Sequence, residues 1–389
     1  MGNGAVYLDN AATSFPKPEE VYTAVLRAMR EECGNPGRSG HRFSLAAGRA
    51  VQDARVMCGK LFNAESPDCI AFSANATVAL NIGIKGVLRP GNHVITSAFE
   101  HNSVSRPLSH LERDGVSVTK LPMDLECGLS TEDIKEALRP DTRLVVCTHV
   151  SNVTGTANDI ASIGALCKDR GILFMVDAAQ SAGCRAINVR DMHIDLLAFA
   201  GHKGVFGPQG TGGLYVRPGV EMSTIMQGGT GRRSESLVQP EVMPDKLETG
   251  TRNSPGLAGL AAGIRFVLDA GIEEIERKEA SLANRLIKGI AGIDGARVAG
   301  PGLAQDRSGI VSVILENVSS VDAALMMDAA FNIAVRGGLH CAADAHISLG
   351  SADAGGALRI SPGYFNTEDE IDCCLAALEA CVAELRVES

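Results

Sequence analysis

A lysine and an aspartate, each at the end of an apolar segment, are the side chains of this sequence best suited to chemistry. Lys203 follows the apolar run 196–200, and Asp177 ends the run 172–176. The carboxyl ends of buried strands share one crevice in an α/β sheet, so the two groups are expected to meet there. A desolvated lysine has a lowered pKa, and its neutral amine attacks carbonyl carbons. Pyridoxal phosphate (PLP) needs that amine and an acid for its ring nitrogen, whereas a plain ion pair is the structural alternative.

Other polar residues follow other strand-like runs. Small residues and a threonine at the start of a helix expose N–H groups to a phosphate, which the helix dipole also favours. An imidazole can stack on a flat ring. Singly, each residue is equally well explained as a cap, a turn or a loop position, but together they indicate one PLP crevice. They are Ala76 and Thr77 after the run 70–73, His101 after 93–97, Asn152 after 144–148, Gln180 after 172–176, and Gly250 with Thr251 farther along.

The charge balance and composition exclude several classes of protein. The 389 residues carry 36 basic and 46 acidic side chains, a net charge of −10, so no nucleic-acid surface is expected. No apolar stretch reaches membrane-spanning length, and the N-terminus lacks the pattern of a secretory signal. The eleven cysteines are scattered, without Cys-x-x-Cys or paired metal-ligand spacing. We therefore expect reduced thiols, a cytoplasmic location and no metal site.

Strand-like and helical patterns alternate through the middle of the chain. This alternation predicts an α/β fold with a mainly parallel sheet covered on both faces. The pattern changes near residue 255, so we predict a large domain over 16–255 and a smaller α+β domain from 1–15 and 256–389. The expected elements of the smaller domain are helices over 257–270, 272–290 and 367–385, the last with a Thr367–Glu370 capping box, and strands over 311–315 and 334–336.

Four motifs, in the right order, resemble one known family. They are Tyr7-Leu8-Asp9-Asn10-Ala11-Ala12-Thr13, Ser151-Asn152-Val153-Thr154-Gly155-Thr156, Val176-Asp177-Ala178-Ala179-Gln180-Ser181 and Gly201-His202-Lys203. Over nearly its whole length the sequence is similar to the class V aminotransferase-fold PLP enzymes, and most of all to their cysteine desulfurase and selenocysteine lyase branch. The resemblance implies the type I fold of PLP-dependent transferases, with a mixed sheet, and a homodimer with shared active sites.

The resemblance also implies a role for each candidate residue. Lys203 would form the Schiff base and act in catalysis with His101, which would stack on the cofactor ring. The other implied roles are phosphate binding by Thr77 with Ala76 and by His202, pairing of Asp177 with the ring nitrogen, contact of Gln180 with the phenolic oxygen, and contact of Gly250-Thr251 with the phosphate of the neighbouring subunit.

Cys341, in the run Val335-Arg336-Gly337-Gly338-Leu339-His340-Cys341, selects the reaction. A transaminase needs no thiol here, whereas a thiolate beside a cationic Arg336 or His340 is a strong nucleophile. A small buried hydrophobe is the alternative, but the glycine and histidine neighbours favour an exposed loop. The run resembles the desulfurase loop that carries the nucleophilic cysteine. Its short distance to Arg359 resembles the short-loop, SufS-like subgroup, which is often aided by a sulfur-accepting protein.

The expected function is a PLP-dependent cysteine desulfurase. Arg359 matches the arginine that clamps the carboxylate of L-cysteine, helped by Asn152 and Arg336. Lys203 would move the Cα proton, and Cys341 would take the sulfur as a persulfide for an acceptor, leaving L-alanine. The alternatives are a selenocysteine lyase acting on L-selenocysteine, a class V aminotransferase or β-lyase that does not use Cys341, and a catalytically silent scaffold.

The sequence departs from the family pattern at several positions. Ala200 stands where the family usually has a serine that hydrogen-bonds the phosphate, so one phosphate contact is expected to be missing. Asn75-Ala76 replaces the more usual glycine and threonine, Leu339 replaces a common histidine, and Ala343-Asp344 differs from the usual continuation. These departures leave cofactor binding intact in outline and bear on the substrate and the acceptor.

Overall fold

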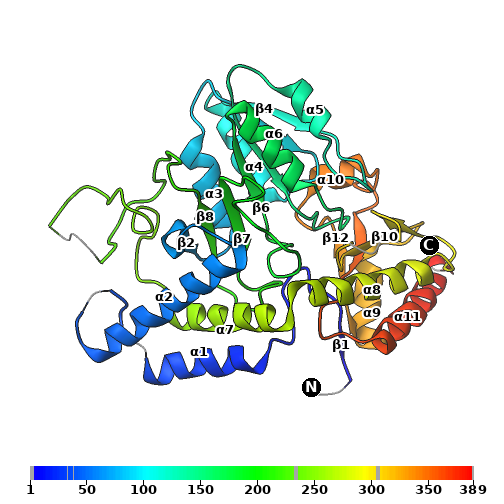
Figure 1. Ribbon diagram of the computed structural model, residues 1–389. Coiled ribbons are helices and arrows are strands. Elements are labelled where there is room, and N and C mark those ends of the chain that lie inside the picture. Colours follow the sequence, from blue (N-terminus) through cyan, green and yellow to red (C-terminus); the bar gives the residue numbers. More distant parts are fainter. Residues whose placement is uncertain (1–3, 33, 38, 232–234, 304–306, 388–389) are drawn as a thin grey trace.

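The computed structural model describes residues 4–32, 34–37, 39–231, 235–303 and 307–387, in two packed parts built around separate sheets (Figure 1). The strands are β1 (Val6–Tyr7), β2 (Ile70–Ser73), β3 (His93–Ser97), β4 (Ser117–Leu121), β5 (Thr142–Thr148), β6 (Leu173–Asp177), β7 (Leu196–Ala200), β8 (Gly212–Val216), β9 (Ala296–Ala299), β10 (Val311–Leu315), β11 (Ile333–Ala334), β12 (Arg336–Gly338) and β13 (Ala357–Ile360). The helices are α1 (Glu19–Glu31), α2 (Arg42–Phe62), α3 (Ala76–Val87), α4 (Asn102–Arg113), α5 (Thr131–Ala137), α6 (Ile160–Arg170), α7 (Ser254–Ala270), α8 (Ile272–Ile290), α9 (Ser320–Phe331), α10 (Ala343–Ser348) and α11 (Glu368–Val387), with one 3₁₀ turn at Pro67–Cys69.

The large sheet is mixed, in the order β2-β8-β7-β6-β5-β3-β4. Pairing is parallel from β4 through β3, β5 and β6 to β7, whereas β8 is antiparallel to both β7 and β2. Because β8 reverses direction between its two neighbours, β2 runs the same way as β7. The carboxyl ends of β2, β3, β5, β6 and β7 therefore meet at one edge of the sheet, and the expected mainly parallel arrangement is confirmed.

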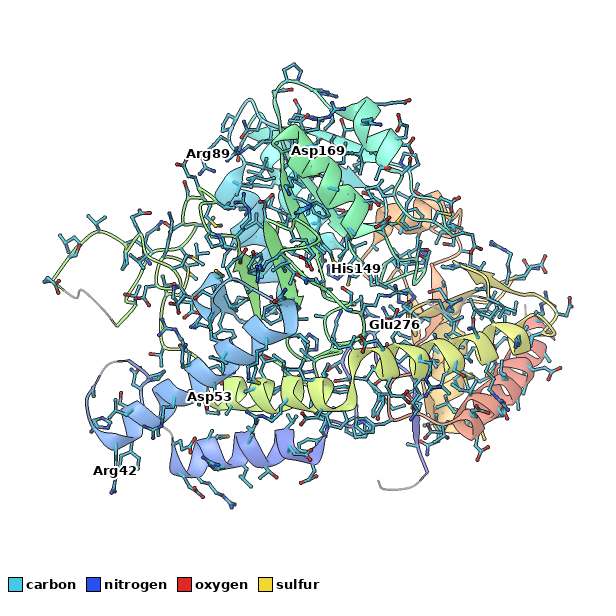
Figure 2. All side chains as sticks on the ribbon, viewed as in Figure 1. Arg42, Asp53, Arg89, His149, Asp169 and Glu276 are labelled. Carbon is cyan, nitrogen blue, oxygen red and sulfur yellow. The ribbon has the colours of Figure 1, made fainter. Side chains whose placement is uncertain are left out.

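Alternate side chains of these strands pack on different helices. Val145 of β5 joins a core cluster with residues of α2, α6 and α7, whereas its neighbour Val146 joins a cluster with residues of α3 and α4. This two-residue period gives the sheet two apolar faces, and it explains why its strands read as continuous apolar runs. Arg89 and Asp169, labelled in Figure 2, are exposed, whereas His149, near the middle of the view, is only 5% exposed.

The second part has its own core. β10 lies between β9 and β13 in an antiparallel sheet that ends at β12, and β1 pairs in parallel with β11. α8, α9 and α11 cover this core with apolar side chains. α7 instead contributes Leu260 and Ile264 to the core of the large sheet. The division into 16–255 and the remaining residues stays a prediction, and residues 1–3 and 388–389 of its smaller domain lie outside the described residues.

Most expected elements are confirmed to within a few residues. The strand expected over 334–336 is wrong, because β11 and β12 break at Val335 and pair with different partners. The capping box is confirmed: Glu370 Oε2 accepts from the N–H of Thr367 at 3.0 Å, and Thr367 Oγ1 accepts from the N–H of Glu370 at 3.3 Å. Within the described ranges no single helix is long and apolar enough to cross a membrane, although α7 and α8, bent by 82°, meet that test of length and composition as a pair.

Candidate active site

One pocket of about 220 Å³ lies at the edge of the large sheet where the carboxyl ends of β2, β3, β5, β6 and β7 meet. Residues that follow β2, β3, β5, β6 and β7 line it together with residues of the smaller sheet. Gly250 and Thr251 do not line it, and Thr251 instead lines a separate pocket with Glu248 and Asn253. The candidates that the fold brings together are Ala76, Thr77, His101, Asn152, Asp177, Gln180, His202, Lys203, Arg336 and Arg359.

Lys203 and Asp177 line this pocket with shifted proton affinities. Burial, aided by the positive charge of Arg359 and opposed by Asp177, lowers the pKa of Lys203 to about 8. Burial raises the pKa of Asp177, while the N–H of Ala179, which donates to its Oδ1 at 2.9 Å, and Lys203 act in the other direction. An amine that loses its proton near neutral pH is the nucleophile that attacks a carbonyl carbon.

His101 is fixed as the N-cap of α4. Its Nδ1 accepts from the N–H of Ser103 at 3.0 Å, so the proton of the neutral ring lies on Nε2. Burial and the positive charges of Lys203 and Arg336 lower the pKa of His101 to about 4, which keeps the ring uncharged. Ser103 Oγ also lies 2.7 Å from the hydroxyl oxygen of Thr77. The ring is therefore held in one orientation on the pocket wall, as stacking requires.

The start of α3 supplies free hydrogen-bond donors to the same pocket. Among the described residues, the N–H groups of Ala76 and Thr77 have no acceptor, because they belong to the first turn of the helix. The Nδ1 of His202 is buried and has no partner among the described residues, and burial lowers the pKa of His202 to about 4. Ala200 adds only a methyl group. Neutral donors at a helix N-terminus suit an anionic group such as a phosphate.

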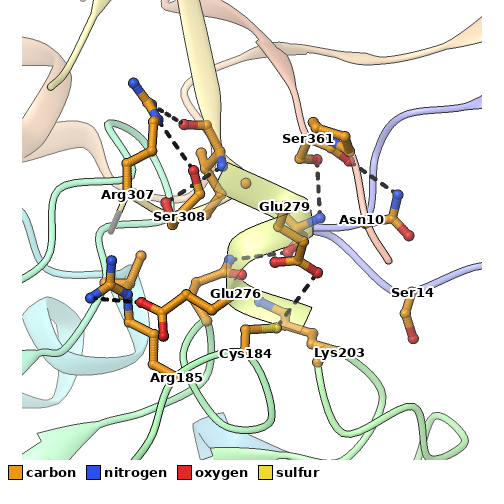
Figure 3. A pocket seen from close by; sticks show the side chains of 18 of the residues that line it. Asn10, Ser14, Cys184, Arg185, Lys203, Glu276, Glu279, Arg307, Ser308 and Ser361 are labelled. Carbon is orange, nitrogen blue, oxygen red and sulfur yellow. Dashed lines mark hydrogen bonds and ion pairs between the residues drawn. The ribbon is translucent and has the colours of Figure 1, made fainter. Parts of the chain in front are cut away.

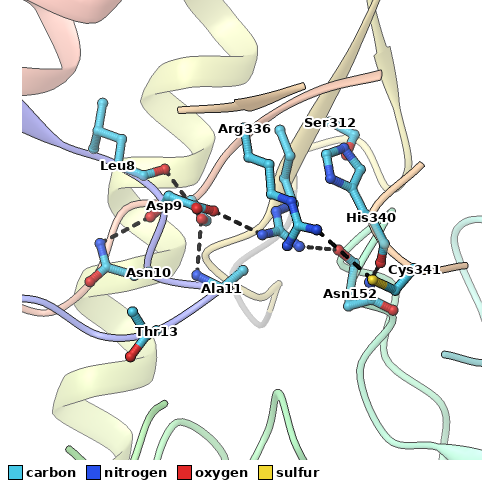
Figure 4. A network of polar contacts seen from close by, with 12 residues as sticks. Leu8, Asp9, Asn10, Ala11, Thr13, Asn152, Ser312, Arg336, His340 and Cys341 are labelled. Atoms are coloured by element: carbon cyan, nitrogen blue, oxygen red, sulfur yellow. Dashed lines mark hydrogen bonds and ion pairs between the residues drawn. The ribbon is translucent and has the colours of Figure 1, made fainter. Parts of the chain in front are cut away.

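Arg359 joins the two parts of the molecule, and its partners Asp9 and Asn152 are labelled in Figure 4. Its Nη2 donates to Asp9 Oδ1 at 2.8 Å, and its Nη1 donates to the carbonyl of Asn152 at 3.0 Å. The side chain is 1% exposed, and its Nε has no partner within the described ranges. A buried guanidinium with an N–H left to donate is suited to a carboxylate ligand.

Cys341 is exposed on the turn between β12 and α10. The backbone is left-handed at His340 (φ 49°) and at Cys341 (φ 59°), and the N–H of Asn102 donates to the Cys341 carbonyl at 2.7 Å. Arg336 Nη2 lies 3.9 Å from the Cys341 sulfur. Burial lowers the pKa of His340 to about 2, so Arg336, and not His340, is the cation beside the thiol. Because both of these neighbours line the pocket, the thiol lies at its margin.

A second, smaller cavity of about 50 Å³ shares Lys203 and Gln180 with the first (Figure 3). By volume it has room for roughly three water molecules. Burial raises the pKa of Glu279 in its wall to about 8, and the Cys184 sulfur lies 3.8 Å from that carboxyl group. Burial and Glu279 also hold the pKa of the Cys184 thiol well above its usual range. Cys184 is therefore a protonated thiol and a poor nucleophile.

The N-terminal segment 9–17 positions the site, and the sequence candidates did not include its residues. The carbonyl of His202, next to Lys203 in the chain, accepts from Thr13 Oγ1 and the N–H of Ser14, both at 3.1 Å, and from Lys17 Nζ at 3.3 Å. Asp9 in the same segment pairs with Arg359, as described above. The run Tyr7–Thr13 carried the family resemblance, but Thr13 bonds a residue 189 positions away and Asp9 one 350 positions away, and no sequence spacing signals them.

The fold and the strand-end lysine and aspartate define a PLP-dependent transferase of type I fold. The chain belongs to the aminotransferase class V family, whose model matches residues 6–373. A probable cysteine desulfurase of Methanothermobacter thermautotrophicus is 37% identical over 96% of this chain and 94% of its own length. Cysteine desulfurase IscS of Clostridium botulinum is 35% identical over 99% and 96%. The apo structure of a cysteine desulfurase from Thermococcus onnurineus has a TM-score of 0.91 at 32% identity, covering 98% of this chain and 95% of that one.

PLP is the cofactor of this family, and the residues present fit it. Asp177 offers a buried carboxyl group for the ring nitrogen, and Lys203 offers an amine for the aldehyde. The free donors of Ala76, Thr77 and His202 match a phosphate. These residues therefore match the ring nitrogen, the aldehyde and the phosphate of the cofactor.

Covalent uptake of PLP should follow the titration of Lys203. With a pKa of about 8, the neutral fraction of the amine rises roughly tenfold between pH 7 and pH 9 and then levels off. We expect the bimolecular rate constant of PLP uptake by the stripped protein to follow this curve, with N-acetyl-lysine measured in parallel to correct for titration of PLP itself. An exposed lysine would give a rate constant that still climbs steeply above pH 9, and that result would contradict the lowered pKa.

Proposed function

We propose that this protein is a cysteine desulfurase, which converts L-cysteine to L-alanine and carries the sulfur as a persulfide on Cys341. The observation that carries the proposal is the exposed Cys341 thiol, 3.9 Å from Arg336 at the margin of the pocket that contains Lys203. A transaminase has no use for a thiol at this place. The names of the relatives given above support the same reaction.

Two arginines of the pocket bind the carboxylate of the substrate. The free Nε of Arg359 and the side chain of Arg336 bind the substrate carboxylate, and Asp9 and the Asn152 carbonyl hold Arg359 in place. Two positive charges near one carboxylate also exclude substrates without an acid group.

The bond changes follow from the residues at hand. Bound PLP supplies an electron sink for the substrate carbon skeleton. Lys203, whose pKa of about 8 leaves part of the amine unprotonated near neutral pH, takes the Cα proton, and His101 and Asp177 orient the ring. Cys341 attacks the substrate sulfur as a thiolate, so an S–S bond forms as the substrate C–S bond breaks. The electron pair of that bond stays with the carbon skeleton, which takes up a proton and leaves as alanine.

The sulfur must then pass to an acceptor, and the exposure of Cys341 supports direct transfer to another protein or a small thiol. The turn of Cys341 leads directly into α10, and β13 begins at Ala357, which supports the short-loop, SufS-like subgroup.

A homodimer with shared sites is part of the proposal. Gly250 and Thr251 do not line the pocket of their own chain. Leu237, Val238 and Val242, in the same connection between β8 and α7, are exposed apolar side chains that a second subunit could cover. Reduced cysteines in the described chain support a cytoplasmic location.

The experiment that tests the proposal compares products from two substrates. Protein loaded with PLP is incubated with L-cysteine or L-selenocysteine, and alanine is quantified against released sulfide or selenide in the presence of a reducing thiol. A desulfurase yields alanine and sulfide in equal amounts from L-cysteine. Turnover of L-selenocysteine alone would identify a selenocysteine lyase, and pyruvate in place of alanine would identify a β-lyase.

A further inference from the structure

Asn75 has an amide group that is fixed in orientation but only half used. It is the N-cap of α3, and its Oδ1 accepts from the N–H of Val78 at 3.0 Å. This bond assigns the oxygen and nitrogen of the amide, so Nδ2 is the atom left to donate. Nδ2 has no acceptor among the described residues, and Asn75 lines the pocket that contains Lys203, beside Ala76 and Thr77.

Asn75 lies close to the position where a hydroxyl donor is missing. Ala200, which has only a methyl group, pairs with Gly212 across β7 and β8. A Cβ on Gly212 would lie 3.0 Å from the Cα and the carbonyl carbon of Asn75, so the bare backbone at 212 lets the start of α3 contact this strand pair. Asn75 and Ala200 therefore border the same part of the pocket wall.

We propose that Asn75 Nδ2 is a ligand of the cofactor phosphate and replaces the hydroxyl donor that position 200 lacks. The inference rests on PLP as the cofactor. Because the cap bond already holds the amide, little side-chain entropy is lost when Nδ2 donates. An acceptor with a negative charge makes this hydrogen bond stronger than one between neutral groups.

Two variants separate phosphate binding from capping. Asn75→Gly removes the amide, and glycine caps a helix almost as well as asparagine, so α3 should be retained. Ala200→Ser supplies a hydroxyl at the other side of the wall. Full-length protein is stripped of cofactor with hydroxylamine and titrated with PLP and with pyridoxal, which lacks the phosphate. The four proteins are wild type, each single variant and the double variant.

We expect Asn75→Gly to raise the dissociation constant of PLP about 10- to 100-fold, the usual effect of one hydrogen bond to a charged group. The constant for pyridoxal should stay within about twofold, and Ala200→Ser should recover most of the loss in the Asn75→Gly protein while changing wild type little. Equal changes for PLP and pyridoxal, or no change for either, would overturn the inference. An equal gain from Ala200→Ser in both backgrounds would overturn the replacement of one donor by the other.

Two further readings keep the outcomes distinct. The unfolding temperature of the stripped Asn75→Gly protein reports the cap. If it falls, Asn75→Asp is used, because its carboxylate restores the cap but cannot donate. Restored PLP binding overturns the ligand role. Since the carboxylate also repels a phosphate, the role is supported only if Ala200→Ser strengthens PLP binding more in Asn75→Asp than in wild type, and an equal gain in both overturns it. A wild-type protein that binds pyridoxal as tightly as PLP would contradict the cofactor itself, whatever the variants show.

Discussion

Replacing Cys341 by alanine should reduce sulfur release from L-cysteine by a factor on the order of 10³ or more, with the cofactor still bound. Loss of a covalent nucleophile removes the chemical step itself, and the remaining groups cannot substitute for it. The fold should not suffer, because Cys341 is exposed and the hydrogen bond from the N–H of Asn102 to its carbonyl survives the change. Alanine and sulfide are both measured, together with the affinity for PLP.

A second exposed cysteine provides the matched control. Cys373 on α11 is exposed, as Cys341 is, but it does not line the pocket that contains Lys203. Cys373→Ala should keep the wild-type rate. Sulfide release by Cys341→Ala at the rate of wild type would instead favour a β-lyase that needs no protein thiol, and the persulfide mechanism would be abandoned.

Replacing Lys203 by alanine should abolish both covalent cofactor attachment and turnover. The loss in rate should be about 10⁴-fold or greater, because the same amine holds the cofactor and moves the Cα proton. PLP should still bind without a covalent bond, because Asp177 and the donors of α3 remain. Reduction with borohydride followed by denaturation and peptide mapping shows whether the cofactor is attached at Lys203.

Lys60, exposed on α2, is the control for a lysine outside the site. Lys60→Ala should retain attachment and rate. Added methylamine, a small amine that fits the space left at position 203, should restore part of the proton transfer in Lys203→Ala. Attachment of the cofactor to another lysine in Lys203→Ala, with turnover near that of wild type, would rule out the proposed role.

Much of the site followed from the order of strands along the chain. Lys203, Asp177, His101 and Asn152 each follow an apolar run, and parallel pairing brings such positions to one edge of a sheet without further information. Continuous apolar runs were enough to locate these strands in the sequence, because the strands are buried on both faces.

Contacts between distant segments were out of reach. Asp9 pairs with Arg359 across 350 residues, and Thr13 contacts His202 across 189, so spacing carries no signal of either. The protonation state of His340 was also open in the sequence, because its burial depends on packing around the turn. The structure makes it neutral, and Arg336 becomes the cation near Cys341.

Two long helices were missed for a local reason. α1 starts after Pro18, which makes no side-chain capping bond, and α2 is capped by His41, whose Nδ1 accepts from the N–H of Ser44. Neither residue is among the usual capping types, so the strongest start signal is missing, although Glu19 and Glu20 place acidic side chains in the first turn of α1. The first helix is nevertheless amphipathic, and it packs against α7.

The most direct measurement follows one sulfur atom. PLP-loaded protein is mixed with one equivalent of L-cysteine labelled with a heavy sulfur isotope, quenched with an alkylating reagent and digested. If Cys341 is the acceptor, its peptide gains one labelled sulfur atom in an amount equal to the alanine formed, and the peptides of the other cysteines gain none. Alanine formation with no labelled sulfur on the Cys341 peptide, or with the label on another cysteine, would contradict the proposed reaction.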